Sequence, residues 1–99
     1  MTAHAHIIID GIKLRRQDSG HPYHPSYMVG YLLQQMRVKF MDIDAEEMAT
    51  GMVRYGGFSC AQGEHGDEEF LYRVNTKRKD VFVYQRQAGA WKFFHRAKA

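Results

Sequence analysis

Strand-like segments at the carboxy-terminal end constrain the fold of this chain more than any other feature. They cover about residues 69–76, 81–87 and 90–96, and short turns at residues 77–80 and 88–89 join them. Connections this short place consecutive strands side by side and antiparallel. The sequence therefore predicts an antiparallel β-meander in this part of the chain.

The last two of these strands carry large apolar side chains on both faces. These side chains are Val81, Phe82, Val83, Tyr84, Trp91, Phe93 and Phe94. A strand that is apolar on both faces needs cover on both sides. One face can pack on helices and the other needs a partner, so we expect a homodimer.

The amino-terminal half predicts a hairpin followed by a helix. The dipeptide Asp10-Gly11 accepts the positive φ angles of a tight turn and separates two apolar stretches. One continuous strand with a glycine bulge is the alternative. Residues 17–25 contain two prolines and read as a loop. Ser26 can cap a helix over about 26–37, where apolar residues recur at helical spacing.

Residues 44–61 allow two interpretations. Asp44 with Glu47 resembles a capping box, and apolar residues keep helical spacing up to Gly56. This pattern favours a second helix. The alternative is that residues 52–61 form a strand that is broken at a pair of glycines.

Size and composition predict one α+β domain spanning residues 1–99, with an amino-terminal hairpin, one or two helices and a curved antiparallel meander. A hydrophobic fraction of 44% argues against global disorder. Cys60 is the sole cysteine, so no internal disulfide can form. No apolar run approaches the roughly eighteen residues that span a bilayer, and the amino terminus does not read as a signal peptide. We expect a soluble, cytoplasmic protein without membrane contact.

Residues 81–95 also follow a recognisable pattern. They read VFVYQRQAGAWKFFH, which is an apolar run, then Arg-x-x-Gly-x-Trp, a basic residue, two apolar residues and a histidine. This stretch resembles the end of the SnoaL-like, nuclear transport factor two-like superfamily. Looser matches are the strand that ends at Asp10, the helix over 26–37 and the pair Tyr55-Gly56.

The resemblance implies a sheet curved into a cone around a helix, with a pocket in the mouth of the cone and often a dimer through the outer face of the sheet. It also implies that residues 52–61 form a strand. Members of the superfamily usually begin with one or two helices that close the cone, whereas this sequence starts almost directly at a strand. On this interpretation the pocket is open or a partner covers it.

A candidate site follows from these strands. The candidate catalytic residues are His95, Asp10 and Tyr84, and the candidate ligand-binding residues are Trp91, Phe93 and Tyr72. Strand alternation predicts that His95 shares a face with Trp91 and Phe93, and a histidine is suited to proton transfer near neutral pH. In the resembling enzymes, pocket His and Asp residues perform acid–base chemistry on small hydrophobic substrates. The alternative is a strand-end histidine bonded to backbone or water.

Basic residues support a second kind of function. They cluster at Arg15 and Arg16 and at the turn Lys77, Arg78 and Lys79. Such clusters contact phosphates in nucleic-acid-binding proteins, although the net charge of +3 is weaker than that of dedicated binders. The alternative is that basic residues in turns and on sheet edges maintain solubility.

Histidines at positions 21 and 24 have a spacing that is used in zinc sites. The adjacent prolines hold this stretch extended, and a second pair of ligands is lacking, so we expect neither a metal ion nor a cofactor.

The sequence is compatible with two kinds of function. The first is a small binding domain with an apolar pocket for a small ligand, where isomerase- or lyase-type acid–base chemistry can occur. The alternative is a non-enzymatic interaction or inhibitor protein that binds a protein or nucleic acid through basic turns and an apolar sheet face.

Overall fold

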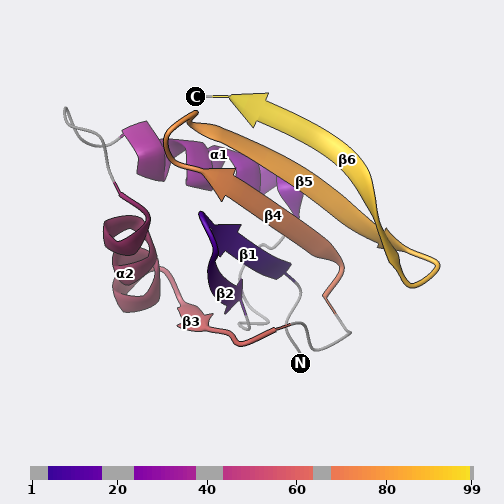
Figure 1. The fold of residues 1–99 in the computed structure, drawn as a ribbon, viewed down its shortest axis with the longest axis horizontal. Coiled ribbons are helices and arrows are strands. Elements are labelled where there is room, and N and C mark those ends of the chain that lie inside the picture. Colours follow the sequence, from indigo (N-terminus) through magenta and orange to yellow (C-terminus); the bar gives the residue numbers. More distant parts are fainter. Residues whose placement is uncertain (1–4, 17–23, 38–43, 64–67, 99) are drawn as a thin grey trace.

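The computed structural model describes residues 5–16, 24–37, 44–63 and 68–98, which form one mixed sheet and two helices (Figure 1). In chain order the elements are β1 (Ala5–Ile9), β2 (Ile12–Arg16), α1 (Pro25–Arg37), α2 (Ala45–Tyr55), β3 (Phe58–Cys60), β4 (Phe70–Asn75), β5 (Asp80–Gln87) and β6 (Ala90–Lys98). The strand order is β3-β2-β1-β4-β5-β6. Strands β1 and β4 are parallel, and the other neighbouring strands are antiparallel. The predicted α+β fold with a hairpin and a meander is confirmed, and the sheet is open.

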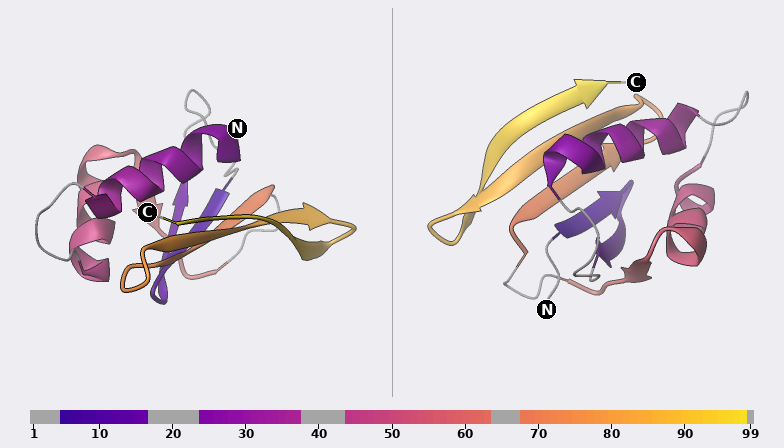
Figure 2. Two further views of the ribbon diagram at one scale, coloured as in Figure 1. Left: turned by 90° about the horizontal axis from the view of Figure 1, so that it is seen from above. Right: turned by 180° about the vertical axis from the view of Figure 1, so that it is seen from behind.

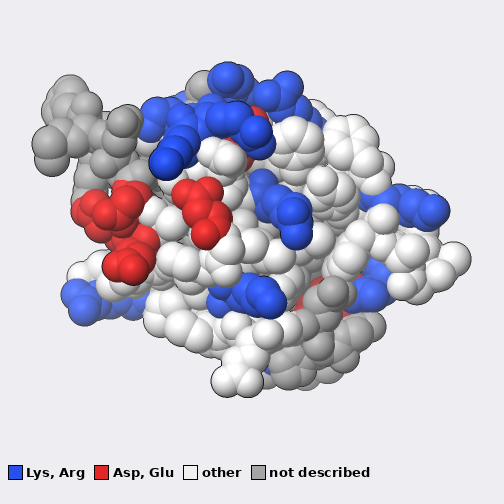
Figure 3. Space-filling model, in the orientation of Figure 1, with Lys and Arg blue, Asp and Glu red and all other residues white. Residues whose placement is uncertain are grey.

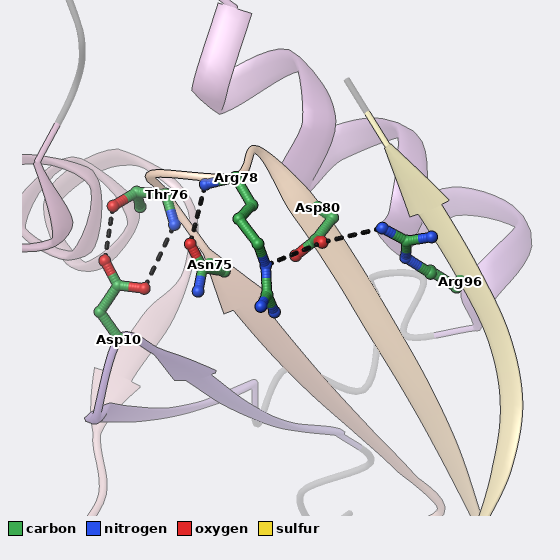
Figure 4. A network of polar contacts seen from close by, with 6 residues as sticks. All are labelled: Asp10, Asn75, Thr76, Arg78, Asp80 and Arg96. Atoms are coloured by element: carbon green, nitrogen blue, oxygen red, sulfur yellow. Dashed lines mark hydrogen bonds and ion pairs between the residues drawn. The ribbon is translucent and has the colours of Figure 1, made fainter.

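The amino-terminal hairpin forms at the predicted turn. Asp10 and Gly11 both have positive φ angles, of 47° and 94°, as a type I′ turn requires. The carboxylate of Asp10 accepts hydrogen bonds from the backbone N–H of Thr76, at 3.2 Å, and from its hydroxyl group (Figure 4). The backbone N–H of Asp10 donates to the carbonyl of Val74 at 3.0 Å. The β1–β2 turn is therefore bonded to the end of β4.

His24, and not the predicted Ser26, caps α1. The backbone N–H of Ser26 donates to Nδ1 of His24 at 3.2 Å, and the N–H of Met28 donates to the His24 carbonyl at 2.9 Å. Pro25 occupies the first helical position, where its missing N–H leaves no hydrogen bond unmade. The cap is therefore His24, and Ser26 lies in the first turn.

The helical interpretation of residues 44–55 is confirmed. The N–H of Glu47 donates to the Asp44 carboxylate at 2.8 Å, as the capping pattern predicts. At the other end, the N–H of Gly56 donates to the carbonyl of Met52 at 2.9 Å. The strand that the family resemblance implies over residues 52–61 is therefore wrong, because a strand is present only at Phe58–Cys60 within that stretch.

The hydrophobic core lies between the helices and one face of the sheet. Helix α1 crosses behind the sheet in Figure 1, and Figure 2 shows the same arrangement from above and from behind. The buried side chains of the core include Ile7, Leu14, Met28, Leu32, Met52, Tyr72, Val81 and Val83. Residues that alternate with the core residues of the strands point to the other face, which no described helix covers. Neither described helix has the length and apolar composition that crossing a membrane requires.

The Asp10 bonds generate a stability prediction. We expect Asp10→Ala to lower the free energy of unfolding by about 2 kcal/mol, because it removes the acceptor of two Thr76 hydrogen bonds and places alanine at a positive φ. Asp10→Asn is the matched control, since asparagine tolerates this φ and its amide can bond both Thr76 groups. Urea unfolding measures both variants. Equal losses in the two variants would contradict this role.

Candidate binding surface on the open sheet face

The face of the sheet opposite the helices carries aromatic and arginine side chains that alternate across neighbouring strands. Directly paired residues of antiparallel strands share a face. Arg73 of β4 is opposite Phe82 of β5, and on β6 the partners of Phe82 and Tyr84 are Arg96 and Phe93. We call this surface the open face and define it as Arg73, Phe82, Tyr84, Arg86, Trp91, Phe93 and Arg96.

Phe93 is the most accessible ring of the open face. It is 62% exposed, because β6 is the edge strand of the sheet. Its ring centroid lies 6.3 Å from that of Phe82 and 6.2 Å from that of Tyr84, with steep angles between the ring planes. These are edge-to-face contacts, which are favourable for aromatic pairs. Two neighbours therefore support Phe93 while much of its ring surface stays available to a ligand.

Two arginines of the open face hold the aromatic rings. The Arg86 guanidinium lies 4.3 Å from the centre of the Trp91 ring, and its Nε donates to the carbonyl of Glu68 at 2.8 Å. The Arg96 guanidinium lies 5.3 Å from the centre of the Phe82 ring. Cation–π contacts at these distances are attractive and restrain both partners. The rings are therefore positioned before any ligand binds.

Asp80 connects the basic β4–β5 turn to the edge strand (Figure 4). One of its carboxylate oxygens lies 3.3 Å from Nε of Arg78 and 3.3 Å from a terminal nitrogen of Arg96. The Asp80 side chain is almost fully buried, whereas both arginines are at least half exposed. One carboxylate thus faces two guanidinium groups, so this margin of the open face remains positively charged.

Arg73 differs from the other arginines of the open face. It is exposed and makes no ion pair with any residue in the described part of the chain. Together with Ile8, Asp10, Asp80, Phe82 and Tyr84 it lines a shallow hollow of about 370 Å³. Its guanidinium is therefore available to an anionic group that enters this hollow.

Charge is unevenly distributed over this side of the molecule. Figure 3 views the open face, with basic side chains along its upper margin and across its middle. Acidic side chains gather at the left, where α2 begins with Glu46 and Glu47. The aromatic part of the open face is therefore bordered mainly by positive charge.

Of the predicted catalytic residues, His95 does not share a face with Tyr84, and a β-bulge is the cause. Tyr84 pairs with Phe93 whereas Val83 pairs with His95, so Phe94 is an extra residue in β6. An extra residue reverses the alternation of side chains along a strand. His95 therefore lies on the same side as the buried Val83, and the prediction that it shares a face with Trp91 and Phe93 is wrong. No feature of β6 alone indicates the bulge, because a bulge depends on how two strands pair.

The other predicted residues are dispersed. Tyr72 is fully buried in the core, and Asp10 is bonded to Thr76 at the far end of β4. Tyr84 lies beside Phe93 on the open face. The structure therefore brings together Tyr84, Phe93 and Trp91 with the arginines between them and separates them from His95 and Tyr72, whereas Asp10 lines the same hollow as Tyr84.

The predicted basic clusters also divide. Lys77, Arg78 and Lys79 form the turn between β4 and β5 at the margin of the open face. Arg15 and Arg16 are consecutive in β2 and so point to opposite faces of the sheet. Arg16 is 3% exposed on the helix side, so it does not extend the surface that Arg15 shares.

Of the two histidines with metal-ligand spacing, His21 lies outside the described residues and His24 caps α1. Within the described ranges, no group of three or more His, Cys, Asp or Glu side chains is arranged to hold a metal ion.

Comparison of this chain with known protein families, with curated proteins and with solved structures found no match.

The Asp80 contacts generate a second stability prediction. We expect Asp80→Ala to cost about 1–2 kcal/mol, a value discounted for solvent screening because Arg78 and Arg96 are at least half exposed. Asp80→Asn keeps one acceptor and should cost less. Urea unfolding at low and high salt measures both variants. A free energy of unfolding for Asp80→Ala equal to that of the wild type would show that the contacts add nothing.

Proposed function

We propose that this chain is a non-enzymatic binding protein that holds single-stranded nucleic acid on its open face. The observation that carries the proposal is the exposed Phe93 ring, supported by Phe82 and Tyr84 and neighboured by arginines. Proteins that bind single strands combine aromatic rings, on which bases stack, with a basic surface that follows the phosphates. The open face provides both.

Charge favours a nucleic acid over a protein as the occupant of this face. Arg73 has no carboxylate partner among the described residues, and Arg78 and Arg96 share a single one. A polyanion neutralises several such groups at once and releases counterions on binding. The net charge of +3 acts in the same direction. The turn with Lys77 and Lys79 would extend the path of the phosphates beyond the rings.

The small-ligand function has less support. It requires His95 to face the same space as Trp91 and Phe93, and the bulge at Phe94 places His95 on the other side of β6. The hollow beside Arg73 is shallow and is lined by charged as well as aromatic groups. Ligand-binding enzymes usually enclose most of a small apolar substrate.

A homodimer through the open face is the main competing arrangement. It would cover Phe93 with a second copy, in line with the two-sided apolar pattern of β5 and β6. It would also bring like charges together, because the same arginines occur on both copies. For this reason the homodimer ranks second to the nucleic-acid complex.

Binding can be tested by fluorescence anisotropy with a labelled oligothymidine of about ten nucleotides. We expect Phe93→Ala to weaken binding about tenfold through lost stacking, whereas Phe93→Tyr keeps most of the affinity. Tyr55→Ala is the matched control, because Tyr55 is an 82% exposed ring on α2, away from the open face. Arg73→Gln should lower the slope of log affinity against log salt by about one.

Three results would overturn the proposal. The first is no binding of the oligonucleotide at low salt. The second is an equal loss of affinity in Phe93→Ala and Tyr55→Ala. The third is a wild type that is dimeric by light scattering, becomes monomeric in Phe93→Ala and does not bind the oligonucleotide, which would assign the open face to self-association.

A further inference from the structure

A second hollow lies away from the open face, where β2 and the two helices meet. Its volume is about 590 Å³, within the range of small-molecule sites. Its lining includes Arg16 of β2, Tyr27 and Tyr31 of α1, Tyr55 at the end of α2, and Gly56. Neither the nucleic-acid proposal nor the predicted catalytic set uses this hollow.

Arg16 is an unusual residue to find in its wall. Arg16 is only 3% exposed, and its Nε is buried without a hydrogen-bond partner. No described carboxylate lies within ion-pair distance of its guanidinium. A buried charge without a counter-charge or full hydrogen bonding costs free energy, so such groups are normally paired. The vacant hydrogen-bonding capacity of Arg16 therefore points to an anionic partner.

Aromatic rings surround Arg16 and compensate for part of this cost. Its guanidinium lies 4.8 Å from the centre of the Phe58 ring and 5.9 Å from that of Tyr27. Between these two rings stands Tyr31, which is stacked on each of them at 6.1 Å from Tyr27 and 5.7 Å from Phe58. Ring faces attract a cation but cannot replace the in-plane oxygen acceptors that a guanidinium prefers.

Gly56 keeps this wall open. A Cβ atom at this position would stand 2.6 Å from the Tyr31 hydroxyl oxygen and 2.9 Å from the Met52 carbonyl oxygen, which is closer than side chains approach. Burial raises the pKa of the Tyr31 phenol, and the nearby Arg16 charge partly offsets this effect. The hydroxyl is therefore neutral at physiological pH and can donate a hydrogen bond.

We propose that this hollow binds a small organic anion, with a carboxylate or phosphate group on Arg16 and a planar body against the tyrosine rings. The guanidinium fork matches both anionic groups, since each offers oxygen atoms at the spacing of two parallel N–H donors. The neutral Tyr31 hydroxyl adds a donor beside the fork. The site is independent of the open face, so either proposal can fail without the other.

Calorimetric titration with benzoate, phenyl phosphate and benzamide tests the site. We expect the wild type to bind one of the two anions with a stoichiometry of one and not to bind the neutral benzamide. Preference between benzoate and phenyl phosphate identifies the anionic group. Arg16→Met should reduce the affinity at least tenfold, because methionine fills a similar volume without charge. Arg37→Met, at the exposed end of α1 and outside the lining of the hollow, should leave the affinity unchanged.

A second readout covers the case in which Arg16→Met does not fold. Arg16→Lys retains the charge without the fork and should bind the anion more weakly than the wild type. In the wild type, the bound anion should perturb the ring resonances of Tyr27 and Tyr31 in NMR spectra, and Gly56→Ala should weaken binding by displacing the Tyr31 hydroxyl. The proposal would be overturned if neither anion bound at millimolar concentration, or if benzamide bound as well as the anions. It would also be overturned if the Arg16 variants bound the anion as tightly as the wild type, or if the resonance shifts were confined to other residues.

Discussion

The parallel pairing of β1 with β4 is the constraint on which the rest of the structure depends. It joins the amino-terminal hairpin to the carboxy-terminal meander in one continuous sheet, with Ala5 opposite Phe70 and Ile9 opposite Val74. Both helices lie in the intervening chain, so the pairing also brings them onto the sheet. The hydrogen bonds between Asp10 and the residues at the end of β4 support the register of this pairing. Without this pairing the hairpin and the meander would each expose the face that now forms the core.

The helices cover only one side of this sheet, and this determines which side chains of each strand are accessible to a ligand. On the helix face, Arg16 and Tyr72 are buried whatever their chemistry, whereas Arg73 and Phe93 on the other face are exposed. The consecutive Arg15 and Arg16 show the consequence, because the second is enclosed among rings while the first belongs to the opposite surface. The two proposed sites thus lie on opposite faces of the sheet because successive side chains of a strand point to opposite sides. On the open face, charged groups between Phe82, Tyr84 and Phe93 also oppose uncontrolled association of the sheet.

The extent to which the site was predictable varied with the range of the interactions involved. The cap of α2 was predictable because Asp44 and Glu47 are three residues apart and interact directly. The cap of α1 was missed because His24 accepts the hydrogen bond through a ring nitrogen, which is an uncommon capping group. The predicted catalytic set failed at Phe94, since a bulge depends on how β5 and β6 pair rather than on either strand alone.

The sequence by itself determined the meander, the tight turn at Asp10-Gly11 and the helix after Asp44, because backbone geometry and side-chain periodicity act over a few residues. The tertiary structure alone decided that β1 lies beside β4, which face of the sheet the helices cover, and hence that Arg16 is buried and Phe93 is exposed. These outcomes depend on contacts between residues about sixty positions apart, whose free energy comes from packing the whole core at once. No local pattern contains that information.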